Sequence, residues 1–146
     1  MSLHSLRKVR AQAVESLMME LAQIAQAMAG SEARYQAIEI EIQTDAESYA
    51  RHTMQGLTIE ALLEWQGRMD AERAALQQVR HEIDQAAASW QRTKARLVEA
   101  SQECKLLDRV AEKRQEAVRA AGQRQEQLAT DEAASRRPSA GSTRET

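Results

Sequence analysis

The stretch that decides the fold is residues 54–62, Met-Gln-Gly-Leu-Thr-Ile-Glu-Ala-Leu. Gly56 suits the left-handed position that follows a helix C-terminus. Thr58 is a typical N-cap, and Glu60 places negative charge in the positive first turn of the next helix. Leu57 and Leu62 have the spacing of a hydrophobic staple, which fixes the angle of entry into that helix. The stretch therefore predicts a short turn between two antiparallel helices.

Mostly apolar residues recur at every seventh position on both sides of this turn, in pairs of series offset by three and four residues as in a coiled-coil seam. Upstream, the two series are Val14, Leu21, Met28, Tyr35, Ile42, Tyr49 and Leu3, Arg10, Leu17, Ile24, Ser31, Ile38, Asp45. Downstream, they are Leu62, Met69, Leu76, Ile83, Trp90, Leu97, Cys104, Ala111, Val118 and Trp65, Glu72, Val79, Ala86, Thr93, Ala100, Leu107, Arg114, Ala121, Leu128. Each helix thus carries one seam.

These features predict an all-α fold, a long two-helix antiparallel coiled coil whose second helix is the longer one. The expected bounds are about 3–55 for helix 1, 56–58 for the turn and 59–134 for helix 2, so that residues 1–134 form the hairpin. Folding the chain back around Leu57 places seam positions opposite each other. The expected pairs are Tyr49 with Trp65, Ile38 with Leu76, Tyr35 with Val79, Ile24 with Trp90 and Leu17 with Leu97.

In this register Leu3 reaches Ala111, and the rest of helix 2 has no partner within the chain. Arg114 interrupts the seam there, and Gly122 costs a helix about 1 kcal/mol relative to Ala. From residue 135 the sequence Ser-Arg-Arg-Pro-Ser-Ala-Gly-Ser-Thr-Arg-Glu-Thr has no periodicity. A disordered tail is expected over 135–146.

Composition excludes an ordinary globular domain. Only 3% of the 146 residues are aromatic, whereas strong helix formers dominate and the single Pro lies near the C-terminus. Both charge signs are interspersed, with a net charge of -2, so nucleic acid is not an expected partner. No apolar stretch approaches a membrane span or a secretory signal, and one cysteine suits a reducing compartment. We expect a cytoplasmic protein without direct membrane insertion.

No catalytic constellation is recognisable. The glycines stand too far apart for a phosphate-binding loop, and the three histidines, His4, His52 and His81, share no metal-ligand spacing with Cys104. Cys104 is interpreted as a small seam hydrophobe. We expect no enzyme activity, no cofactor and no metal.

Two seam residues stand out. Trp65 has two interpretations, packing within the hairpin or an anchor for a partner near the turn. Glu72 is a carboxylate at a seam position, which destabilises a coiled coil unless it is exposed. It is expected to mark either local fraying or a polar contact to another protein.

The second helix is rich in charge where its partner has ended. Such a run is often only a solvated face, but a helix of this length needs something to bind. The candidate partner-binding residues are Arg109, Lys113, Arg114, Glu116, Arg119 and Trp65, with Arg7 and Arg10 as the next place to search.

The stretch 106–116, Leu-Leu-Asp-Arg-Val-Ala-Glu-Lys-Arg-Gln-Glu, resembles the C-terminal signature of the FliJ family of flagellar export proteins. The resemblance continues through the following charged residues, and upstream through the stretch around Ser89-Trp90. The residues concerned are Arg119, Arg124, Asp131, Glu132, Arg136 and Arg137, and upstream Lys94 and Leu97. The chain departs from the family pattern at Ala117-Val118 and Ala120-Ala121-Gly122, where more charged residues are usual.

The resemblance implies a hairpin similar to the central shaft of rotary ATPases. It implies three partners: the hexameric flagellar export ATPase, whose assembly and turnover the shaft promotes, the export gate membrane protein, and export chaperones. It also implies peripheral association with the inner membrane at the export apparatus. Two alternatives remain, an injectisome counterpart of the YscO type and a generic structural coiled coil that self-associates through its seams.

Overall fold

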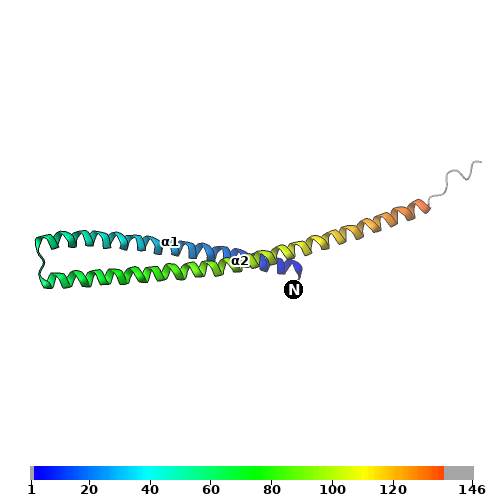
Figure 1. Ribbon diagram of the computed structural model, residues 1–146. Helices are drawn as coiled ribbons and strands as arrows, with labels where there is room; N and C mark the ends of the chain where they lie inside the picture. Colours follow the sequence, from blue (N-terminus) through cyan, green and yellow to red (C-terminus); the bar gives the residue numbers. More distant parts are fainter. Residues whose placement is uncertain (1, 137–146) are drawn as a thin grey trace, which may run out of the picture. The chain divides into compact units, whose positions relative to one another are not determined.

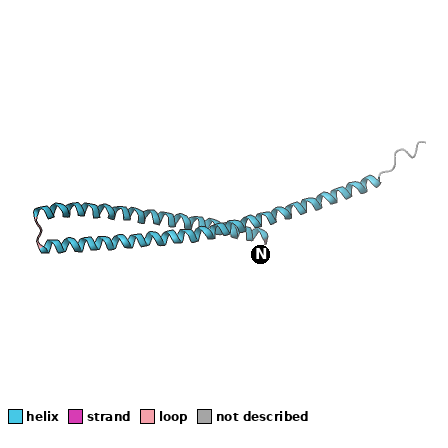
Figure 2. Cartoon of the chain, in the orientation of Figure 1, coloured by secondary structure: helices cyan, strands magenta, loops and turns pink. Residues whose placement is uncertain are grey.

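The computed structural model describes residues 2–136, which form two helices, α1 (Leu3–Gln55) and α2 (Ile59–Arg136). Figures 1 and 2 show α1 and α2 lying side by side next to the turn that joins them, with opposite chain directions. No strand occurs within the described residues. The predicted all-α antiparallel hairpin with a longer second helix is confirmed.

The turn forms through the residues that predicted it. Gly56 has a φ of 96°, which favours glycine, and its N–H donates to the carbonyl of Thr53 at 3.2 Å. The hydroxyl of Thr58 accepts a hydrogen bond from the N–H of Ala61 at 3.2 Å. The carbonyl of Thr58 accepts the first helical bond, from Leu62, at 3.0 Å. Gly56 therefore ends α1 and Thr58 caps α2.

Burial follows the two predicted heptad seams. Every seam position from 14 to 49 is half-buried, and every seam position from 62 to 111 is half-buried or buried. The three buried residues in this part of the chain are Glu72, Val79 and Thr93. Because each helix packs against one other helix only, most seam side chains keep one side open to solvent.

Contacts between the helices fix the register. The rings of Tyr49 and Trp65 lie 5.9 Å apart, which confirms the pair expected from the sequence. An ion pair joins Arg34 to Glu82 further from the turn. These contacts place the two seams against each other as predicted.

The chain divides into two compact units, Ala11–Ser101 and Met1–Arg10 together with Gln102–Thr146. The first unit contains the turn and most of the seam. The second contains the start of α1 and the C-terminal part of α2, and it is described as far as residue 136.

The expected boundary between helix 2 and the tail, at about residue 134, lies two residues too early, because α2 continues through Ser135 to Arg136. Good helix formers, Ala133 and Ala134, precede these residues, and the hydroxyl of Ser135 donates back to the carbonyl of Glu132 at 2.9 Å. The remainder of the predicted disordered tail, 137–146, lies outside the described residues. Neither helix combines the length and the apolar character that crossing a bilayer requires.

Candidate partner-binding site

The C-terminal part of α2 continues beyond the residues that α1 covers. Ala111 is the last half-buried seam residue, and from Glu112 to Arg136 every residue except Gly122 is exposed. Val118 and Leu128, both at seam positions, are 73% and 64% exposed. We call residues 112–136 the unpaired segment, because within the described chain no other element covers it.

An open groove of about 660 Å³ lies where α1 begins beside α2. It brings two predicted site residues, Arg114 and Arg119, together with Arg7, beside apolar side chains such as Val118. The complete lining is Leu3, Arg7, Asp108, Ala111, Glu112, Arg114, Gln115, Val118 and Arg119. The groove therefore combines three guanidinium groups and two carboxyl groups with apolar side chains.

The other predicted residues of this segment lie outside the groove. Arg109, Lys113 and Glu116 are exposed on α2, and none of them lines it. The candidates thus separate into a groove set, Arg114 and Arg119, and a solvent-facing set. Their spacing on α2 places Arg109, Lys113 and Glu116 on one helical stripe.

Two ion pairs hold the start of α1 against α2. Nε and Nη2 of Arg7 donate to Oδ1 of Asp108 at 3.1 and 2.9 Å. Nη1 of Arg10 lies 2.9 Å from Oε2 of Glu103. Sequence reasoning treated Arg7 and Arg10 only as a second place to search, although the predicted register places each opposite a direct neighbour of an acid, Leu107 beside Asp108 and Cys104 beside Glu103. The four side chains are between 42% and 56% exposed, so each pair contributes little to stability.

Trp65 lies near the turn in the unit Ala11–Ser101. Its ring is half-buried, with the rings of Tyr49 and His52 at 5.9 and 5.8 Å and the guanidinium carbon of Arg68 at 5.7 Å. With Glu64 and Arg68 it also lines a shallow surface pocket. Trp65 therefore packs within the hairpin while part of its ring stays accessible.

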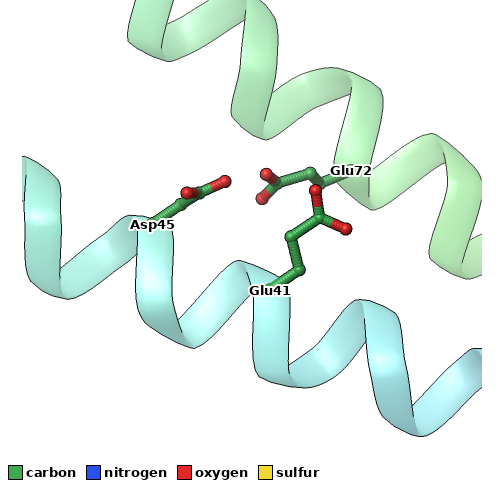
Figure 3. A group of neighbouring side chains, drawn as sticks. All are labelled: Glu41, Asp45 and Glu72. Carbon is green, nitrogen blue, oxygen red and sulfur yellow. The ribbon is translucent and has the colours of Figure 1, made fainter.

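The expectations for Glu72 are wrong. Glu72 is only 8% exposed, and its helix is continuous there, so it marks neither fraying nor a surface contact. Figure 3 shows its carboxyl group pointing at those of Glu41 and Asp45 on α1. One oxygen from each of the three groups lies within 4.8 Å of the others. We call Glu41, Asp45 and Glu72 the acidic cluster.

The acidic cluster raises the pKa of the Glu72 carboxyl group. Both of its oxygens, and Oδ2 of Asp45, are buried without a hydrogen-bond partner among the described residues while the groups are ionised. A proton on Glu72 restores a hydrogen bond to Asp45, and this bond is the main reason that the pKa of Glu72 rises from 4.5 to about 7. Burial and the negative charges of Asp45 and Glu41 raise the pKa further, and Arg68 opposes them.

Sequence reasoning missed the acidic cluster, although the signal was present. Glu41 and Asp45 are four residues apart and share a helix face, and Asp45 and Glu72 were both assigned to the seam. Elsewhere in the described chain no other three metal-ligating side chains come this close. Cys104 is half-buried with a free thiol, at the seam position assigned to it.

Comparison with known families gives a match over residues 1–142 to the model described as Flagellar FliJ protein. No curated protein and no solved structure matches the chain. The match spans both helices, and it agrees with the resemblance of the stretch 106–116. The chain therefore belongs to the FliJ family and is a flagellar, export-related protein.

Proposed function

We propose that this protein is the non-enzymatic stalk of a flagellar type III export ATPase. In this role it promotes assembly of the hexameric ring and raises its ATP turnover. It also links the ATPase and the export chaperones to the membrane export gate, peripherally at the inner membrane. Membership in the FliJ family supports the flagellar export setting.

The exposed state of the unpaired segment is the observation that carries the proposal. Residues 112–136 are helical, and all but Gly122 are exposed. An isolated helix of this length is only marginally stable in water, because most helical stability in proteins comes from packing. A partner that encloses the segment would supply that packing. The pore of a ring encloses a helix on all sides.

The residues that line the groove indicate which chemical groups a partner would present to it. Arg114 and Arg119 form no ion pair within the described residues, whereas Arg7 beside them is engaged by Asp108. Free guanidinium groups bind carboxylates through paired hydrogen bonds and favour helix C-termini. Val118 adds apolar area at the same place. The complementary surface therefore carries acidic groups beside apolar side chains.

A two-helix stalk has a physical route to stimulating a ring. Its surface lacks sixfold symmetry, so at any moment it makes different contacts with different subunits. Contacts that favour one subunit conformation over another shift the populations of the nucleotide states. Hydrolysis at one interface can then be coupled to release at another.

The direct test mixes the purified export ATPase with a molar excess of this protein. ATP turnover should rise, and the oligomer distribution should shift toward hexamers. The control is a chain truncated after Ala111, which keeps the paired helices and lacks the unpaired segment. Unchanged turnover and unchanged oligomers with the full chain would refute the stalk assignment.

A second candidate function, a self-associating coiled coil, is favoured by the exposed seam residues Val118 and Leu128. Light scattering separates the two. The stalk proposal predicts a monomer in dilute solution, because the seam of α1 and the seam of α2 as far as Ala111 pack against each other within one chain. A stable dimer that dissociates in the chain truncated after Ala111 would favour self-association.

A further inference from the structure

The acidic cluster lies in the unit Ala11–Ser101. Glu41 and Asp45 project from successive turns of α1, and Glu72 projects from α2 toward them (Figure 3). Burial decreases from Glu72 through half-buried Asp45 to exposed Glu41. The three carboxyl groups therefore lie close together, with Glu72 shielded from solvent at the seam and Glu41 exposed to it.

A buried carboxylate without a partner is energetically unfavourable. Glu72 is more than nine-tenths buried, and neither of its oxygens has a hydrogen-bond partner in the described chain. Asp45 is also incompletely satisfied, since the Nε of Arg68 lies 3.7 Å from its Oδ2, beyond hydrogen-bond distance. One positive charge beside three carboxylates leaves a net of two negative charges. The cluster therefore favours either a proton or a cation.

We propose that Glu41, Asp45 and Glu72 form a binding site for a hard divalent cation that bridges α1 and α2. Carboxylate oxygens are the ligands that such cations prefer. Two oxygens on opposite sides of a Ca²⁺ ion lie about 4.8 Å apart, twice its usual bond length of about 2.4 Å. One oxygen from each of the three carboxylates lies within that distance of the other two. Mg²⁺ or Mn²⁺ would draw them closer together.

The geometry also sets limits on affinity. Three protein ligands leave the rest of the coordination sphere to water, which can enter beside exposed Glu41. The positive charge of Arg68 repels a cation and weakens its binding. A proton on Glu72 also weakens binding, because it competes with the cation for the same oxygen atoms. Binding is therefore expected to be weak at acidic pH and stronger at pH 8, and to stabilise the hairpin because the ligands come from both helices.

The experiment uses the full chain, freed of metal by a chelator and then dialysed. Calorimetric titration with Ca²⁺, Mg²⁺ and Mn²⁺ separately at pH 8 should give saturable binding of one equivalent for at least one of them. At a tenfold excess over Kd, the melting temperature should rise by roughly 4 °C. At pH 5.5 the same titration should show at least tenfold weaker binding.

Four variants localise the site. Glu72→Gln and Asp45→Asn each remove one charged ligand with little change in shape, and each should reduce affinity at least tenfold. Glu39→Gln makes the same charge change at an exposed position outside the cluster and should leave affinity unchanged. Arg68→Gln removes the repelling charge and should tighten binding several-fold.

Mn²⁺ provides an independent readout, because it broadens the NMR signals of nearby nuclei. The backbone amides of Glu41, Asp45 and Glu72 should broaden before those of the unpaired segment. The proposal is overturned if no cation binds saturably at pH 8, or if Glu72→Gln and Glu39→Gln bind alike. It is also overturned if broadening begins elsewhere, which would indicate general attraction to a charged surface.

Discussion

The rings of Tyr49 and Trp65 meet edge to face across the hairpin, with centroids 5.9 Å apart and ring planes at 69°. They lie in the seam near the turn, with His52 and Arg68 also close to the ring of Trp65. Edge-to-face aromatic pairs add to the free energy of burial. The pair therefore contributes strongly to holding the two helices together at this end.

Replacing Trp65 tests this contribution. Trp65→Ala should lower the free energy of unfolding by about 2 kcal/mol, below the range for a fully buried Trp because the ring is half-exposed. Trp65→Phe should lose less, since an aromatic ring still meets Tyr49. Urea denaturation followed by circular dichroism measures both, with Leu63→Ala, at a 61% exposed position, as the control. Equal losses for Trp65→Ala and Leu63→Ala would contradict the packing role.

Replacing glycines by alanine should change the stability of the hairpin in opposite directions at the turn and within the helices. Gly56→Ala places a Cβ in the left-handed region, which costs about 1 kcal/mol or more, although nothing lies within 4 Å of that position. Gly30→Ala and Gly67→Ala lie within helices, also with open space around the new Cβ, and should each stabilise the hairpin by up to about 1 kcal/mol. Thermal melting compares the three variants. Stabilisation by Gly56→Ala would contradict the assigned turn.

The acidic cluster predicts that stability depends on pH. The pKa of Glu72 is about 7 in the folded chain and near 4.5 when unfolded, so the folded state binds the proton more tightly. The resulting stabilisation is complete below about pH 4.5 and is lost as the pH rises through about 7. Measured in chelator, the melting temperature should fall between pH 5 and pH 8, relative to a Glu72→Gln variant. Parallel profiles for the two proteins would contradict the raised pKa.

Removing the carboxyl group altogether should stabilise the hairpin. Glu72→Leu places an apolar side chain at a buried seam position and removes two unpartnered oxygens. By analogy with other replacements of buried charges, we expect a gain of about 1–3 kcal/mol in chelator at pH 8. Denaturation in urea measures it, with Glu39→Leu as the exposed control. A loss of stability would mean that the carboxyl group has a compensating partner.

The sequence predicted the hairpin because each local signal agreed with the others. Every heptad position from 14 to 49 and from 62 to 111 is half-buried or buried, and Gly56 and Thr58 located the turn. A repeat of seven residues determines which face of a helix is buried. Two such faces can pack against each other in only a few registers. The contact between Tyr49 and Trp65 followed from the same geometry.

The acidic cluster was missed because a pattern of apolar positions says nothing about where polar atoms meet. Asp45 and Glu72 each occupy a seam position. Their carboxyl groups meet only because the register of the hairpin brings these two positions, on different helices, close together. The groove was missed for a related reason. Its lining combines the first turns of α1 with a part of α2 about a hundred residues later, so no local spacing could reveal it.

The last prediction concerns the basic residues of α2 around the end of the paired region. Arg109, Lys113 and Arg114 are all exposed, and Arg114 also lines the groove. If they bind acidic groups of the ATPase, replacing all three by Ala should strongly reduce stimulation of turnover. Any stimulation that remains should be more sensitive to salt, because fewer charged contacts survive.

The same triple variant should leave the hairpin almost unchanged. Surface charges away from packed residues alter stability by no more than about 0.5 kcal/mol each, so melting should shift little. The matched control replaces Arg92, Arg96 and Lys105, three exposed basic residues within the paired region, by Ala. This control removes the same net charge and should keep full stimulation. Full stimulation by the first triple variant, or equal loss in both, would exclude a specific role for this segment and direct the search to Arg7, Arg10 and Trp65.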